Sequence, residues 1–141
     1  MKKLTLLLAP IATLFSASLF TSCSEPESNE PTIVGTWEYK VVEEDATGIV
    51  TFVFNTDGSG SMTLKEVEGA SSYQESVTFE YVYLAEQETL NILFDSYDFE
   101  LAEDLLYCTR IEAKITANKL MLRFWYGEEG VDGGVVLTRV K

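Results

Sequence analysis

Chemically active side chains are unevenly represented in this chain, which has 23 Asp and Glu, two Cys and no His. Without His there is no Ser-His-Asp triad, no Cys-His pair, no imidazole zinc ligand and no imidazole pH switch. A formal net charge of −13 repels phosphate backbones, so we expect no nucleic-acid partner. We also expect no enzyme activity, no cofactor and no metal centre, which leaves the cysteines, aromatics and acidic loops to be explained.

Two loops collect carboxylates and amides. Asn55–Gly60 partly resembles a calcium loop, but Val53 stands where an acid is needed and no closing Glu follows. Asn, Asp and Gly together favour a hairpin turn there instead. Gly127–Gly134 holds three carboxylates, which fit a solvated hairpin tip or a weak cation site. Nothing singles out the carboxylate pair at fixed separation that a glycosidase requires.

The N-terminus has the pattern of an export signal. Lys2 and Lys3 precede the uncharged run Leu4–Phe20, which contains Pro10. A spanning helix needs about 20 mostly apolar residues, whereas a signal peptide needs a basic start and a shorter apolar middle. The sequence therefore predicts export from the cytoplasm.

The end of this run resembles a bacterial lipobox, reading Leu19-Phe20-Thr21-Ser22-Cys23, with Phe20 where the strict pattern has Leu, Val or Ala. The resemblance implies a lipoprotein signal peptide over residues 1–22, cleaved before a lipidated Cys23. The alternative is an ordinary signal peptide in which Cys23 is a chance thiol. Stable membrane anchoring needs at least two acyl chains, and the resemblance implies three on Cys23.

Residues 23–32 are predicted to be the lipidated Cys and an acidic flexible linker, since Ser24–Thr32 reads SEPESNEPT. Cleavage at Cys23 changes the net charge to −15, because residues 1–22 hold two Lys and no acid. We expect a lipid-anchored protein of the Gram-negative cell envelope, on the outer membrane. The linker glutamates resemble a surface-export signal, and the surface and periplasmic faces both stay open.

Residues 33–141 are predicted to form an all-β, eight-stranded antiparallel up-and-down barrel. Short runs with period-2 alternation are separated by short polar turns, which favours antiparallel neighbours. The predicted strands are Ile33–Val42, Ile49–Asn55, Ser61–Val67, Tyr73–Leu84, Thr89–Asp95, Tyr107–Thr116, Lys119–Tyr126 and Gly134–Val140. A short helical turn is expected near residues 97–105. A barrel of this size is either filled by side chains or holds one small ligand.

Gly35-Thr36-Trp37 at the start of the first strand and Leu137-Thr138-Arg139 near the end of the last resemble the G-x-W motif and terminal Arg of lipocalins. Together with the lipobox, they make residues 33–141 similar to small bacterial lipoproteins with one lipocalin-like domain. The resemblance implies that Gly35, Trp37 and Arg139 close the barrel, with the Arg over the indole. The domain is shorter than a typical lipocalin and lacks clear further motifs, so its lumen would be smaller.

The resemblance implies binding of a small apolar or amphiphilic ligand inside the barrel. The inward aromatics either line a pocket or fill the core; Tyr81 and Tyr83 are the preferred ligand residues, because a buried hydroxyl needs a partner. The full predicted set is Tyr81, Tyr83, Phe52, Phe79 and Phe124.

The alternative is a protein-interaction module, such as a subunit of an envelope complex or a hydrolase inhibitor. It would use acidic loops on a filled barrel and suit a basic protein partner. The loops are Glu43–Asp45, Glu66–Glu68, Asp98–Asp104 and Glu128–Asp132. Cys108 is expected on the face opposite Ile111, as an exposed, poorly reactive thiol or as one half of an intermolecular disulfide.

Overall fold

The chain forms a closed antiparallel β-barrel in which each strand pairs with its neighbours in sequence and β1 pairs with β8. The computed structural model describes residues 31–98, 102, 105, 107–127 and 131–140. The strands are β1 (Gly35–Val42), β2 (Ala46–Phe54), β3 (Ser59–Glu68), β4 (Ser71–Leu84), β5 (Thr89–Phe94), β6 (Arg110–Ile115), β7 (Lys119–Trp125) and β8 (Val131–Arg139), with a 3₁₀ turn, η1 (Ala85–Gln87), before β5. This confirms the predicted fold class, strand number and strand order.

Alternating apolar residues form these strands because a pleated strand sends successive side chains to opposite faces. The inward positions of neighbouring strands are in register, as in the row Trp37, Phe52, Met62 and Val77. All four side chains in this row are buried. The apolar stripes therefore merge into one core inside the barrel.

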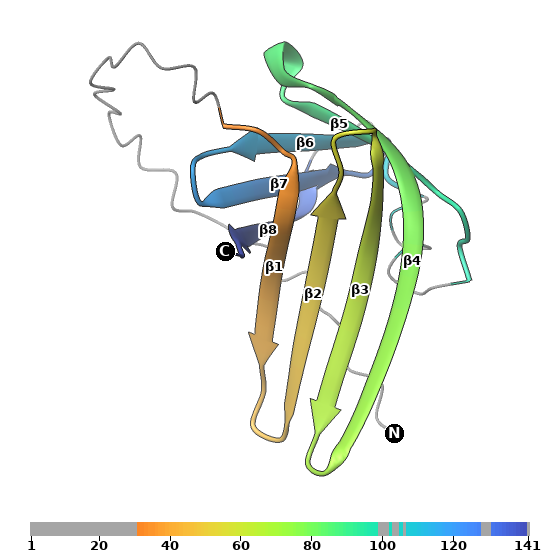
Figure 1. The fold of residues 1–141 in the computed structure, drawn as a ribbon, viewed down its shortest axis with the longest axis vertical. Helices are drawn as coiled ribbons and strands as arrows, with labels where there is room; N and C mark the ends of the chain where they lie inside the picture. Colours follow the sequence, from red (N-terminus) through yellow and green to blue (C-terminus); the bar gives the residue numbers. More distant parts are fainter. Residues whose placement is uncertain (1–30, 99–101, 103–104, 106, 128–130, 141) are drawn as a thin grey trace.

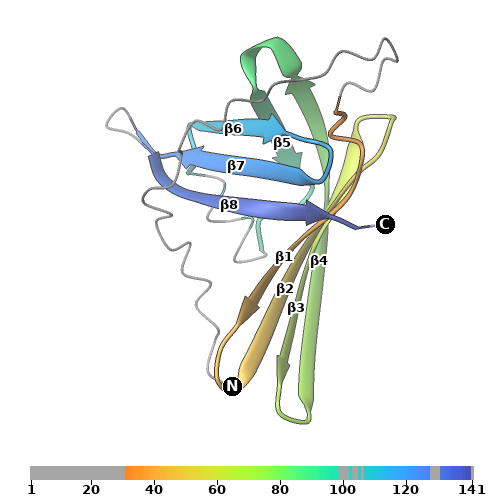
Figure 2. The same ribbon diagram turned by 90° about the vertical axis from the view of Figure 1, so that its left-hand side faces the viewer.

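The barrel consists of two sheets that cross. Figure 1 shows β1–β4 as long ribbons lying side by side, with β6–β8 running across behind them. Figure 2 shows the same crossing from the side. Two short seams join the sheets, with two paired positions between β1 and β8 and two between β5 and β6. The lower halves of β1–β4 therefore extend beyond the closed part of the barrel.

Up-and-down connectivity gives the barrel two different ends. The closed end holds the turns β2–β3, β4–β5 and β6–β7, together with the start of β1 and the end of β8. The open end holds the connections β1–β2, β3–β4, β5–β6 and β7–β8. The described residues of the predicted acidic loops belong to these connections or border them, so topology gathers those residues at the open end.

Several predicted boundaries move. β2 begins at Ala46 rather than Ile49, and β6 begins at Arg110 rather than Tyr107. The later start follows from Thr109, whose N–H and hydroxyl both donate to the Trp125 carbonyl, at 2.7 and 2.9 Å. Of the predicted helical turn near residues 97–105, Ala102 and Leu105 are described as helical and buried, and much of the rest lies outside the described residues.

The predictions for the signal peptide, Cys23 and most of the linker also fall outside the described residues. Over the part of the chain that is described, no helix has both the length and the apolar character needed to cross a membrane.

Candidate binding site at the open end of the barrel

Trp37 and Arg139 fasten the closed end. Trp37 is fully buried, and its indole N–H donates to the Ile33 carbonyl at 2.8 Å. The Arg139 guanidinium carbon lies 4.1 Å from the centre of the Trp37 ring, within cation–π range. The same guanidinium donates to the carbonyls of Thr32, Val34 and Ala117 at 2.7, 3.0 and 3.1 Å. One side chain thus joins the first strand, the last strand and the β6–β7 turn.

Gly35 is needed for this arrangement. Its φ is +136°, a conformation that side chains disfavour, and a Cβ there would lie 2.6 Å from an Arg139 nitrogen. The structure therefore brings together Gly35, Trp37 and Arg139, the three residues that sequence reasoning assigned to barrel closure.

A column of aromatic rings fills the barrel from the closed end toward its middle. Phe52, Phe54 and Phe79 are at most 3% exposed, and their ring centres lie 5.5–6.3 Å apart. Phe94 continues the column at 5.6 Å from Phe79. These spacings are those of packed aromatic pairs, so Phe52 and Phe79 act here as core side chains.

Tyr81 and Tyr83 also belong to the closed end. The Tyr81 hydroxyl donates to the Asn55 carbonyl at 2.6 Å, and the Tyr83 hydroxyl donates to the Ala113 carbonyl at 3.3 Å. Burial raises the pKa of both phenols. Both hydroxyls therefore have a backbone partner within the fold.

The five predicted ligand residues do not form one pocket. Phe52, Phe79 and Tyr81 lie in the aromatic column. Phe124 is buried on β7, paired with Ile111 and Gly133 on the neighbouring strands. All five are used in packing, so a ligand inside the barrel would have to contact other side chains.

Burial decreases along β1–β4 toward the open end. In the row beyond Trp37, Tyr39, Leu64 and Glu75 are half-buried and only Val50 is fully buried. In the last row, Tyr73 is 43% exposed. The concave face of these strands is therefore partly open to solvent where the second sheet no longer covers it.

Five half-buried side chains pack against the core at this end, and we call them the open-end lining: Tyr39, Leu64, Tyr97, Cys108 and Tyr126. Tyr97 and Cys108 come from the β5–β6 connection and Tyr126 from the β7–β8 connection. Three of the five are Tyr, which combines apolar area with a polar tip. Alternation did place Tyr39, Leu64 and Tyr126 inward. Sequence reasoning missed Tyr97, Cys108 and the group as a whole, because its members come from four separate segments.

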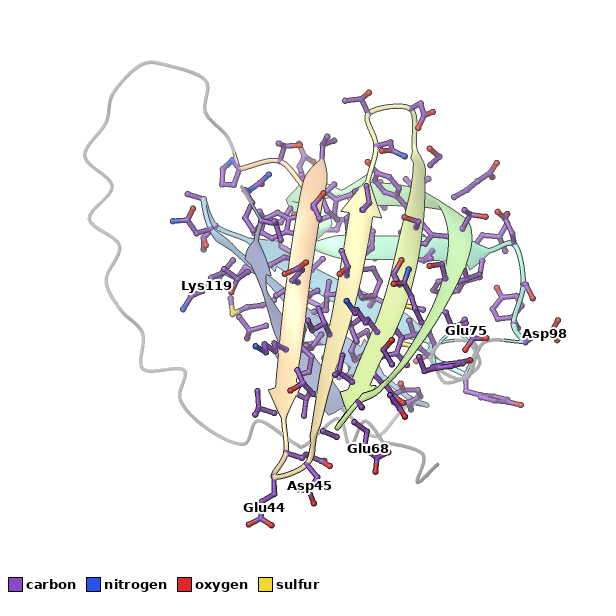
Figure 3. The ribbon with its side chains drawn as sticks, turned by 60° about the horizontal axis from the view of Figure 1, so that its bottom comes forward. Glu44, Asp45, Glu68, Glu75, Asp98 and Lys119 are labelled. Carbon is purple, nitrogen blue, oxygen red and sulfur yellow. The ribbon has the colours of Figure 1, made fainter. Side chains whose placement is uncertain are left out.

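Carboxylates surround the lining. We call Glu43, Glu44, Asp45, Glu68, Glu75 and Asp98 the acidic rim. Figure 3 shows Glu44, Asp45 and Glu68 at the hairpin tips, Glu75 and Asp98 together at one side, and Lys119 far from the rim. Glu75 accepts a 2.9 Å hydrogen bond from the Tyr73 hydroxyl, which raises the pKa of that phenol. The described parts of the predicted acidic loops thus share one end of the molecule.

The predicted exposure of Cys108 is wrong. Alternation along a strand does not apply to it, because β6 begins two residues later. Its thiol is half-buried and donates to the Arg110 carbonyl at 3.0 Å. Burial is the main influence on the pKa of this thiol and raises it. A neutral, partly covered thiol is poorly reactive.

The Asn55–Gly60 segment has the hydrogen bonds of a tight turn. Gly58 has a φ of +85°, and the Asp57 carboxylate accepts from the Ser59 N–H and hydroxyl at 2.9 and 2.6 Å. These bonds lower the pKa of Asp57. Among the described residues, no three acidic or sulfur side chains are grouped closely enough to hold a metal ion.

The outer face of β6–β7 carries a separate cationic cluster. Arg110 and Arg123 each lie 5.9 Å from the Trp125 ring centre, and Arg123 pairs with Glu112 at 3.6 Å. A charged hollow of about 190 Å³ adjoins them, lined by Glu88, Glu112, Lys114, Met121 and Arg123. This cluster lies on the outside of the barrel, on the opposite side of the sheet from the lining.

Comparisons with family models, curated proteins and solved structures give no match, so the barrel geometry and the residues at its open end are the basis for a functional assignment.

Proposed function

We propose that this protein is a lipid-anchored binding protein of the bacterial cell envelope that captures a small amphiphilic molecule at the open end of its barrel. The observation that carries the proposal is the half-buried, Tyr-rich lining at the open end of a barrel whose closed end is filled by aromatic rings. Ligand surface buried there contributes about 25 cal/mol per Å² before ordering costs are subtracted.

The acidic rim suggests which end of the ligand stays near water. Apolar parts of the ligand would contact Tyr39, Leu64 and Tyr97, while a cationic group would face carboxylates such as Glu75. Opposite charge at a partly solvated rim adds specificity and association rate more than affinity. The proposal involves no catalytic step.

Native mass spectrometry of the protein purified from its own cells is the direct test. A reproducible added mass that disappears on denaturation supports a carrier and identifies the chemical class of the ligand. A bare protein that also fails to bind a cationic fluorescent amphiphile contradicts the proposal.

Two variants locate the ligand. Leu64→Asp places a charge in the lining and should abolish the added mass. Lys65→Asp, one residue along β3 on the exposed face, is the matched control and should leave it unchanged. If both variants lost the added mass, or if neither did, the result would contradict a site at the open end.

The membrane anchor has its own test. Cys23→Ala should release the protein from the membrane fraction, because lipid on that thiol is the proposed attachment. A variant that stays membrane-bound would contradict lipid anchoring without affecting the binding proposal.

A basic protein partner is the second candidate function. It is favoured by the exposed apolar side chains Val42, Tyr73 and Tyr107, at 69, 43 and 69% exposure, which accompany the acidic rim at the open end. Exposed aromatic groups beside charge are common anchors of protein interfaces. Chemical cross-linking in cells, with recovery of a basic protein through rim carboxylates, tests this function.

A further inference from the structure

We propose that the free edge of β4, residues Ser71–Val77, is a docking site for an extended basic segment of a partner protein, which adds a strand to the β1–β4 sheet. This inference goes beyond the capture of a small molecule and concerns a different surface, the sheet edge rather than the lining.

The edge exists because β4 is longer than the strand beside it. β4 pairs with β3 along Ser71–Glu80, but its pairing with β5 begins only at Phe79. One further bond, from the Asp95 N–H to the Thr78 carbonyl at 2.9 Å, extends that ladder. Among the described residues, none pairs with β4 between Ser71 and Val77 on this side.

Backbone groups on this edge point away from β3. Tyr81 donates its N–H to the Gly58 carbonyl at 2.8 Å. The backbone N–H and C=O groups of odd-numbered residues of β4 therefore point toward β3. Antiparallel ladders alternate, so Ser72, Gln74 and Ser76 direct their N–H and C=O groups outward. All three residues are exposed. An extended peptide can take up such a row of donors and acceptors by strand addition.

Charge selects the occupant. Glu75 lies on the edge segment itself, and Glu66 and Glu68 lie opposite that segment on β3, against the single basic residue Lys65. Asp98, which Figure 3 shows on the same side of that view as Glu75, adds to the negative charge at this end of the barrel. A segment with Lys or Arg at alternate positions would face these carboxylates, and Tyr73, 43% exposed, supplies aromatic surface beside them.

The same charge disfavours two other occupants. A second copy of the chain would bring its own Glu75 against this edge, and like charges facing across strands are destabilising. The linker Ser24–Thr32 carries three Glu and two Pro, which repel the edge and lack ladder donors. An acidic residue at a free edge thus rejects these partners while favouring a basic one.

Three nine-residue peptides with blocked ends test the inference, using the full chain purified in a non-ionic detergent. The first alternates Lys and Val, the second alternates Glu and Val, and the third is the first with a central Pro. We expect the Lys-Val peptide to bind at least tenfold more tightly than the other two. We also expect it to slow hydrogen exchange of the Ser72, Gln74 and Ser76 amides at least tenfold.

Two variants place the contact. Gln74→Pro removes an outward N–H that β3 does not use, so the fold should survive and peptide affinity should fall at least tenfold. Glu75→Gln should weaken binding about threefold, as expected for one exposed charge pair. Glu80→Gln, on the part of β4 that pairs with β5, is the matched control and should have no effect.

Some results would overturn the inference. They are equal binding of the Glu-Val peptide, unchanged exchange at the three amides, retained affinity in Gln74→Pro, or dimerisation of the free protein through this edge.

Discussion

The closed and open ends of the barrel are made from the same strands but fix their side chains differently. At the closed end, Trp37 donates one hydrogen bond to a backbone carbonyl and Arg139 donates three. The Tyr81 hydroxyl donates another. At the open end, Tyr39 and Leu64 are half-buried and the sheet continues past its neighbours.

This difference shows how a small barrel can keep both stability and a surface for binding. Side chains held by several partners cost free energy to displace, so the closed end is poorly suited to accept a ligand. Surface that is only partly covered can be buried by a partner without breaking existing contacts. We therefore assign stability to the closed end and binding to the open end, and four measurements can contradict that division.

Trp37→Ala should have the largest effect. Removing a fully buried indole together with its Arg139 contact should lower the free energy of unfolding by about 3–5 kcal/mol. Tyr39→Ala, two residues along the same face of β1, is the control and should cost about 1 kcal/mol. Urea denaturation measures both. Equal losses, or a loss below about 1 kcal/mol for Trp37→Ala, would contradict the division.

Gly60→Ala tests how tightly the aromatic column is packed. A Cβ at Gly60 would lie 2.3 Å from the Phe79 ring and 2.5 Å from the Val53 carbonyl oxygen. Overpacking of this kind costs about 1–3 kcal/mol. Ser61→Ala, on the outer face of β3, should change the free energy of unfolding by less than about 0.5 kcal/mol. A neutral Gly60→Ala would show that the column has room for a ligand.

Tyr81→Phe separates a structural hydroxyl from a ligand contact. Losing the bond to the Asn55 carbonyl should cost about 1 kcal/mol, and Tyr83→Phe should cost less because its bond is longer, 3.3 against 2.6 Å. Thermal unfolding measures the loss of stability in both variants. Native mass spectrometry measures whether each variant keeps a bound ligand. A Tyr81→Phe variant that lost a bound ligand would move the site to the closed end.

Strand order and barrel closure could be predicted from the sequence, because both depend on local patterns. Alternation identified the eight strands, and the short turns required neighbouring strands to pair. The resemblance of Gly35, Trp37 and Arg139 to the lipocalin motif and terminal Arg carried their assignment to barrel closure, and the structure places the three in contact.

The open end could not be predicted in the same way. The β4 edge depends on where β5 stops pairing, and the Tyr97 position depends on an irregular connection. Alternation also failed at Cys108, because Thr109 ends the ladder by bonding to the Trp125 carbonyl. Inward direction alone could not distinguish Tyr81 from Tyr39, since their different roles depend on hydrogen-bond partners from other strands.

The smallest expected effect concerns the Cys108 thiol, which marks the boundary between packed core and open-end lining. Burial raises its pKa, so the neutral thiol stabilises the fold below the pKa of the unfolded chain, and this contribution disappears as pH rises through the higher folded pKa. Alkylation by iodoacetamide between pH 7 and 10 should therefore be slower in the native protein than in urea, with its midpoint at higher pH. Identical profiles in the two states would show that Cys108 is solvent-exposed and that the open end is less covered than its half-buried side chains indicate.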